Sequence, residues 1–121
     1  MLNKLATWLG ILAPPPPDYS APMRSALDQF SSAIKLYHFF SCSFCARVHR
    51  TLHSLGLQLE LRDVSENAEY RSELISGGGR STVPCLRIQS SSGDVRWMYE
   101  SSDIIAWLKQ QVAHIISRNH D

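Results

Sequence analysis

Two cysteines separated by two residues are the part of this sequence best suited to chemistry. Cys42 and Cys45 belong to the run CSFC at positions 42–45, and the chain has one further cysteine, Cys85. A pair at this spacing in a reducing compartment indicates thiol–disulfide exchange or a metal site. A zinc site made by the three cysteines with His38 or His49 would lack a second pair at ligand spacing, so we expect no metal.

Composition and charge narrow the class of protein. The chain has 121 residues, of which 44% are hydrophobic, and this is enough for one domain with a real core. Its 12 Lys and Arg residues against 11 Asp and Glu residues give a formal net charge of +1. This balance offers no electrostatic basis for binding nucleic acid. Three cysteines are also too few for a secreted disulfide framework, so we expect a cytoplasmic protein.

The cysteine pair falls where a predicted strand turns into a predicted helix. Residues 34–40 are rich in aromatic and branched side chains, as in a buried strand. The next segment has apolar residues at helical spacing and ends at Gly56. With Ser41 as the N-cap, Cys42 would lie on the first turn, where unpaired N–H groups and the helix dipole stabilise a thiolate. Cys45, one turn later on the inward face, would then act as the resolving thiol.

The residues alone leave other interpretations of this region open. Both cysteines could be small core residues with no redox role. Arg47 and Arg50 lie further along the same helix and would add favourable charge if they point toward the pair, but the sequence does not show their direction. The five histidines have no spacing that indicates a metal site or a catalytic base.

The rest of the chain alternates predicted strands and helices. Leucines alternate with polar residues over 57–62, as in a strand with one wetter face, and a helix is predicted over 66–75. Residues 83–88 and 96–99 read as a hairpin, and a final helix begins near Ser101 or Ser102, either of which can cap it. The order β-α-β-α-β-β-α predicts an α/β fold on a mixed four-stranded sheet. Its first two strands would be parallel and its last two antiparallel.

Residues 1–33 precede this unit. Met1–Ala13 is an apolar run too short to cross a bilayer, with leucines at helical spacing. Such a segment either contacts a membrane surface, packs on its own domain or on a partner, or is a frayed end. Four prolines at 14–17 form a stiff spacer after it, and residues 18–33 read as a short helical lead-in.

Three motifs in order carry a resemblance to a known family. CSFC at 42–45, TVP at 82–84 and ESSDII at 100–105 resemble the motifs of glutaredoxins and of the N-terminal domains of glutathione transferases. The resemblance covers about residues 35–110, and the chain looks like a small bacterial-type glutaredoxin-like protein with an N-terminal extension. It implies a thioredoxin fold, with residues 34–117 as the glutaredoxin-like domain and Pro84 in the cis form.

The same resemblance implies how glutathione is held as co-substrate. Thr82, Val83 and Pro84 form the segment whose backbone at Val83 would pair with the cysteinyl part of glutathione. Glu100 and Ser101 resemble the groups that hold its γ-glutamyl end. A carboxylate there can take an ammonium, while a hydroxyl and helix N-terminal amides can take a carboxylate.

The sequence departs from the family pattern at two positions. Glutaredoxins commonly carry a lysine where this chain has Phe39, and a proline where it has Ser43. These departures bear on the rate and the redox potential rather than on the class of reaction. Cys85, directly after the TVP motif, would be a third redox thiol, a site of glutathionylation or a small core residue.

These features predict a glutathione-dependent thiol–disulfide oxidoreductase that reduces protein or glutathione mixed disulfides. In this interpretation Cys42 attacks and Cys45 resolves. The alternatives are a non-catalytic glutathione-transferase-like binding or membrane-recruitment module, and an iron–sulfur or zinc carrier that uses Cys42.

Overall fold

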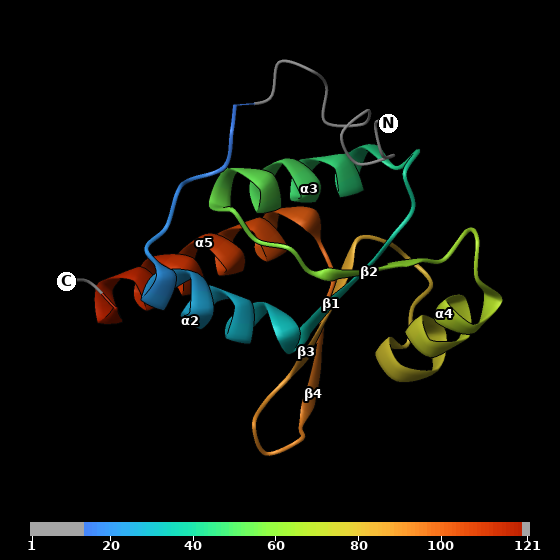
Figure 1. Cartoon of the computed structure of the whole chain (residues 1–121). Coiled ribbons are helices and arrows are strands. Elements are labelled where there is room, and N and C mark those ends of the chain that lie inside the picture. The colour runs from blue at the N-terminus through green and yellow to red at the C-terminus, as the bar shows by residue number, and fades with distance from the viewer. Residues whose placement is uncertain (1–13, 120–121) are drawn as a thin grey trace.

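The computed structural model describes residues 14–119 and gives them an α/β fold (Figure 1). The predicted membrane or packing segment Met1–Ala13 lies outside the described residues. The elements in chain order are α2 (Ala21–Ser32), β1 (Ile34–His38), α3 (Ser43–Leu55), β2 (Glu60–Asp63), α4 (Ala68–Glu73), a π-helical turn (Leu74–Gly78), β3 (Cys85–Gln89), β4 (Val95–Met98) and α5 (Ser101–Arg118).

The four strands form one mixed sheet in the order β2-β1-β3-β4. β1 and β2 are parallel, with Leu36 opposite Leu61. β3 is antiparallel to both β1 and β4, with Leu86 between Leu36 and Met98. The predicted fold class and the predicted strand directions are therefore confirmed.

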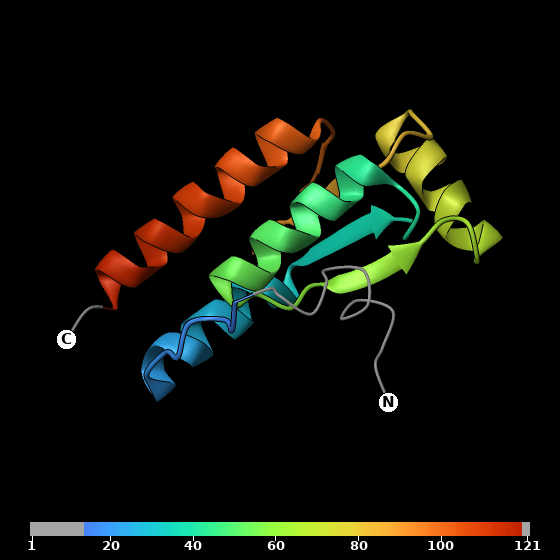
Figure 2. The same cartoon turned by 90° about the horizontal axis from the view of Figure 1, so that it is seen from above.

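Helices cover the sheet unequally. α2, α3 and α5 lie together on one face, while α4 lies on the other (Figures 1 and 2). β1 contributes side chains to the cores on both faces of the sheet, because successive side chains of a strand point to opposite faces. Leu36 belongs to the main core beneath α3 and α5, and Tyr37 belongs to a smaller cluster with Leu74, Cys85 and Tyr99.

The ends of several elements differ from the predictions for local reasons. Cys42, not Ser41, is the N-cap of α3, because its own sulfur accepts the hydrogen bond that a cap provides. Leu57 extends no strand, since its N–H bonds back to the Leu52 carbonyl at the end of α3, and β2 begins only at Glu60. α5 begins at Ser101 itself, with Glu100 rather than a serine in the capping position.

α3 ends at Gly56, as predicted, and α2 occupies Ala21–Ser32. Gly56 caps α3 in the left-handed conformation at φ 69°, which glycine adopts without steric cost. α2 packs on α5 and β1. The segment before it is held to α3, because the Tyr19 hydroxyl donates to the Leu55 carbonyl at 2.7 Å. Within residues 14–119, no helix is long and apolar enough to cross a membrane.

Candidate active site

The strand directions bring three distant segments to one edge of the sheet. The carboxyl end of β1 meets the start of β3, because Tyr37 pairs with Cys85 in an antiparallel register. The start of β3 in turn meets the end of β4, where Leu86 pairs with Met98. The segments that contain Cys42, residues 82–84 and residues 100–101 therefore converge there.

Cys42 lies at the N-terminus of α3, where its sulfur meets hydrogen-bond donors. The Cys45 N–H donates to the Cys42 Sγ at 3.2 Å, and the Cys42 carbonyl accepts from the Ala46 N–H. A sulfur at this position has a direct N–H donor and lies at the positive end of the helix dipole. Cys42 is partly exposed, so a substrate disulfide can reach it.

Cys45 lies one turn along α3 and is completely buried. Burial, together with a hydrogen bond to Cys42, raises the pKa of the Cys45 thiol far above its usual value. The two cysteines are separate thiols in this structure. One sulfur is therefore accessible, and its neighbour remains protonated beneath it.

The segment before β3 faces the accessible sulfur. The Val83–Pro84 bond is cis, as the family resemblance implied. The Val83 carbonyl oxygen lies 4.0 Å from the Cys42 Sγ, and Thr82 is exposed beside it in the chain. The structure thus brings Cys42 and Val83 together, and it leaves polar groups of this segment open to a ligand.

The start of α5 adds two further predicted residues and one that the sequence could not place. Ser101 is buried, and its Oγ accepts a hydrogen bond from Arg47 Nη1 at 3.2 Å. The Arg47 side chain therefore extends from α3 toward the start of α5. Glu100 is exposed, and it has a positive φ of 69° that a residue with a side chain seldom adopts. Such a conformation is often associated with a functional site.

A tyrosine holds the loop that leads into residues 82–84. The Tyr99 hydroxyl donates to the Arg80 carbonyl at 3.0 Å and accepts from the Arg80 N–H at 3.3 Å. The Arg80 guanidinium also stacks 4.1 Å from the centre of the Tyr99 ring. Gly78 lies so close to this hydroxyl that a methyl group at that position would clash with it. The Arg80 side chain is thus committed to Tyr99 in the free protein.

Cys85 belongs to a different environment from the Cys42–Cys45 pair. It is completely buried in the smaller cluster with Tyr37, Leu74 and Tyr99, on the α4 side of the sheet. Burial raises the pKa of the Cys85 thiol to about 12. Of the three interpretations of Cys85 given above, this environment supports that of a small core residue.

Two histidines form a buried pair that sequence reasoning missed. His49 Nε2 lies 3.1 Å from His38 Nδ1, and both side chains are almost inaccessible. Burial lowers the pKa of His38, and burial together with His38 lowers the pKa of His49 to about 3. The available signal was the position of His49 on the inward stripe of α3, four residues after Cys45.

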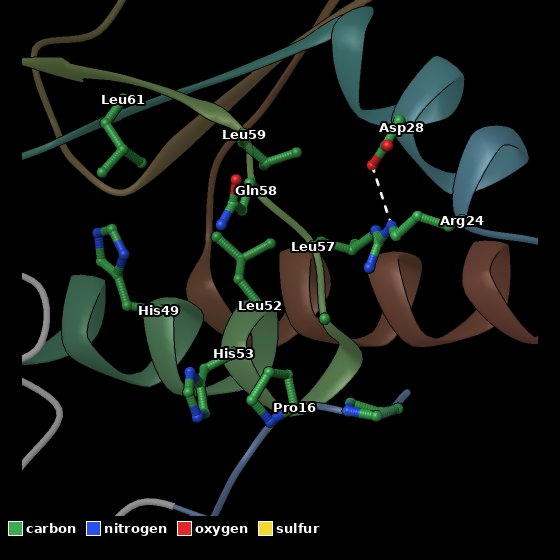
Figure 3. Close-up of a pocket in the computed structure, with 12 residues that line it drawn as sticks. Pro16, Arg24, Asp28, His49, Leu52, His53, Leu57, Gln58, Leu59 and Leu61 are labelled. Carbon is green, nitrogen blue, oxygen red and sulfur yellow. Dashed lines mark hydrogen bonds and ion pairs between the residues drawn. The ribbon is translucent and has the colours of Figure 1, made fainter. Parts of the chain in front are cut away.

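A groove of about 510 Å³ lies away from the thiols, between α3, the segment before β2 and the proline spacer (Figure 3). Leu52, Leu57 and Leu59 line it together with His49, but neither Cys42 nor Cys45 does. Among residues 14–119, no group of three or more His, Cys, Asp or Glu side chains is arranged to hold a metal ion.

Comparison with known proteins gives the family. A mixed sheet with helices on both faces and a CxxC pair at a helix N-terminus is the arrangement of a thioredoxin-like thiol–disulfide oxidoreductase. The glutaredoxin family model matches residues 34–91. Glutaredoxin 3 of Escherichia coli strain K12 is 32% identical over 57 residues, which are 47% of this chain and 69% of the relative. The chain belongs to the glutaredoxin family, and it is a glutathione-dependent thiol–disulfide oxidoreductase with glutathione as co-substrate.

Solved structures agree with this fold. A crystal structure of wheat glutaredoxin aligns with a TM-score of 0.53 at 19% identity, over 81% of this chain and 92% of the wheat protein. The holo form of glutaredoxin C1 from Populus tremula x tremuloides aligns with a TM-score of 0.51 at 20% identity, over 82% and 98% of the two chains. At this identity the likeness shows the fold alone.

Proposed function

We propose that Cys42 is the nucleophile and Cys45 the resolving thiol of this oxidoreductase. The observation that carries the proposal is the position of the Cys42 Sγ, which is accessible, accepts the Cys45 N–H and faces the Val83 carbonyl. The Cys42 thiolate attacks a glutathione mixed disulfide and releases the protein substrate as a thiol. Glutathione then remains on Cys42 until a second glutathione, or Cys45, displaces it.

Glutathione occupies the edge of the sheet described above. The backbone of Val83 binds the cysteinyl part in strand-like pairing, with Thr82 and Pro84 shaping that segment. Ser101 and the first amides of α5 bind the γ-glutamyl carboxylate, and Glu100 binds its ammonium group. Arg47 supports this site by orienting the Ser101 hydroxyl.

Disulfide-containing or glutathionylated proteins are the second substrate. Phe44, between the two cysteines, keeps 58% of its surface exposed. An exposed aromatic ring beside the nucleophile offers an apolar contact to a polypeptide that carries the target sulfur.

A coupled assay of glutathione-driven reduction of mixed disulfides tests the assignment. Cys42→Ser should abolish turnover. Cys45→Ser should keep activity on glutathionylated substrates, because glutathione itself can resolve the mixed disulfide. Cys85→Ala is the matched control and should resemble wild type. Wild-type turnover by Cys42→Ser would overturn the proposed roles.

The location and membrane contact of the protein are further proposals. A cytoplasmic location fits a dithiol that depends on a reducing glutathione pool. Peripheral membrane contact through Met1–Ala13 stays a prediction supported by the leucine spacing of that segment. Vesicle co-sedimentation of the full chain and of a version that starts at Asp18 would test it, and equal partition of the two would contradict it.

A further inference from the structure

A shallow basic hollow runs between α3 and α5, beginning next to the proposed glutathione site. It has a volume of about 410 Å³ and is lined by Arg47, Arg50, Thr51, Ser54, Ile105 and Lys109. Its first residue, Arg47, bonds to Ser101 at the start of α5. Figure 2 shows the two helices side by side, with their N-terminal ends at the same end of the molecule.

Among the described residues, the lining of the hollow contains cationic side chains and no acidic one. Arg50 and Lys109 are exposed, and within residues 14–119 neither of them forms an ion pair. No acidic side chain of that part of the chain lines the hollow, and α3 contains no Asp or Glu at all. Its floor is polar, since the Thr51 hydroxyl donates to the Arg47 carbonyl and the Ser54 hydroxyl to the Thr51 carbonyl.

Most acidic residues lie away from the hollow, although Glu100 and Asp103 lie at the start of α5. The segment from β2 to α4 contains Glu60, Asp63, Glu66, Glu69 and Glu73. Figure 1 shows α4 across the sheet from α3 and α5. A chain with almost no net charge is therefore locally basic on the helices that flank the nucleophile. Such a local field selects partners by charge and speeds their association.

We propose that this hollow binds an acidic polypeptide segment next to the target cysteine of the protein substrate. The inference rests on the proposed function, since it specifies which protein disulfides reach Cys42. Guanidinium and ammonium groups over a polar floor bind Asp and Glu carboxylates well, and Arg50 can do so in bidentate form.

The length of the hollow limits which substrate residues it contacts. Ile105 and Lys109, which line the hollow, and Ser101, which lies just beyond it toward the glutathione site, follow one another at intervals of four along one face of α5. At about 1.5 Å of rise per residue, this stripe is roughly 12 Å long. An extended peptide covers that distance with about four residues. The recognised acidic residues therefore lie within a few positions of the target cysteine.

Steady-state kinetics on short glutathionylated peptides tests the proposal. Two sets of three peptides would be used, with the variable residues before the modified cysteine in one set and after it in the other. Within each set, the three peptides carry aspartates, lysines or neutral residues at these positions. Glutathionylated cysteine without flanks serves as the small substrate. We expect wild type to prefer the aspartate peptide to the lysine peptide in kcat/KM by about three- to tenfold in one of the two sets. Added salt should reduce this preference.

The decisive variant reverses both exposed charges, Arg50→Glu with Lys109→Glu. It should lose or invert the preference while its turnover of glutathionylated cysteine stays at the wild-type level. The matched control, Arg71→Glu with Arg96→Glu, changes the net charge equally on exposed residues outside the hollow and should keep the preference.

Three outcomes would overturn the inference. If the two double variants have the same preference for the aspartate peptide over the lysine peptide, the hollow does not recognise the substrate. If the Arg50/Lys109 variant loses as much activity on glutathionylated cysteine as on the peptides, its charges act on glutathione instead. Tighter binding of an oligonucleotide than of the aspartate peptide, lost in the first variant alone, would assign the hollow to nucleic acid. Failure of the proposed function looks different, because wild type would then reduce none of the substrates, including glutathionylated cysteine.

Discussion

The backbone N–H of Cys45 donates a hydrogen bond to the Sγ of Cys42 across 3.2 Å. The residue proposed as resolving thiol thus donates a backbone hydrogen bond to the proposed nucleophile, while its own sulfur is buried. One short segment therefore produces two cysteines of different reactivity without a nearby lysine, whose usual place is taken by Phe39.

This difference predicts an order of alkylation. At neutral pH, iodoacetamide should modify Cys42 in the native protein well before Cys45 or Cys85, because both of the latter are buried and have raised pKa values. Peptide mapping by mass spectrometry after timed quenching measures the order. All three cysteines should react together in denaturant, and early labelling of Cys45 in the native state would contradict the prediction.

Arg47 should affect glutathione binding through Ser101. Arg47→Ala removes the donor that fixes the Ser101 hydroxyl, and a lost hydrogen bond of this kind should raise the KM for glutathione about three- to tenfold with little change in kcat. Arg50→Ala is the matched control, since Arg50 lies one turn further along α3 and should leave this KM unchanged. An equal rise in both variants would indicate a general effect of charge.

Tyr99 should stabilise the loop before the cis proline. Tyr99→Phe removes a hydroxyl that bonds to both backbone groups of Arg80 and should lower the free energy of unfolding by about 1–3 kcal/mol, with a higher KM for glutathione. Urea denaturation and the coupled assay measure the two effects. Tyr70→Phe is the control, because the Tyr70 hydroxyl has no hydrogen bond within residues 14–119 and only its ring contacts Arg62.

The His38–His49 pair should make stability depend on pH. The pKa of each is lower in the folded protein than the usual 6.5, so the unfolded chain binds protons more readily. The free energy of unfolding is therefore at its full value above pH 6.5. It should fall as the pH decreases toward 3, by at most about 1.4 kcal/mol per pH unit for each proton taken up.

Urea midpoints measured across this range would test the pair. His49→Gln should flatten the slope because it removes the group with the larger shift. His114→Gln should preserve the slope, since His114 is exposed on α5. Identical slopes in the two variants would show that acid sensitivity arises elsewhere, for example at Asp63, whose pKa is lowered by hydrogen bonds from Ser65 despite its partial burial.

Local patterns predicted most of the fold, and they failed where one element competes with the next. The apolar stripe of α3 and its stop at Gly56 were predicted correctly because both depend on neighbours within one turn. The predicted start of β2 at residue 57 was wrong. The alternating leucines are typical of a strand, but the Leu57 N–H bonds to the Leu52 carbonyl at the end of α3. The predicted N-cap of α3 was also wrong. Serine is a common N-cap, which favoured Ser41, but the Cys42 sulfur accepts the capping hydrogen bond.

The site could be predicted only where its residues belong to motifs. The spacing of Cys42 and Cys45 by itself indicates redox chemistry or a metal site, whereas the glutathione-binding roles of Val83 and Ser101 were implied only by the family resemblance. Contacts between side chains of different helices and strands could not be predicted, because they leave no pattern within one stretch of the sequence. The direction of Arg47 depends on how α5 packs on α3, and the pairing of His38 with His49 depends on how α3 packs on β1.

The burial of Cys85 on the far side of the sheet keeps its thiol away from the Cys42–Cys45 pair in the folded protein. Oxidation of the Cys42–Cys45 pair leaves an odd thiol that cannot reach the new disulfide while the sheet is intact. Unfolding of the oxidised chain removes this barrier, and Cys85 can then exchange with either sulfur or with another chain. Folding therefore protects the protein from covalent scrambling, and thermal damage should be less reversible in the oxidised than in the reduced protein.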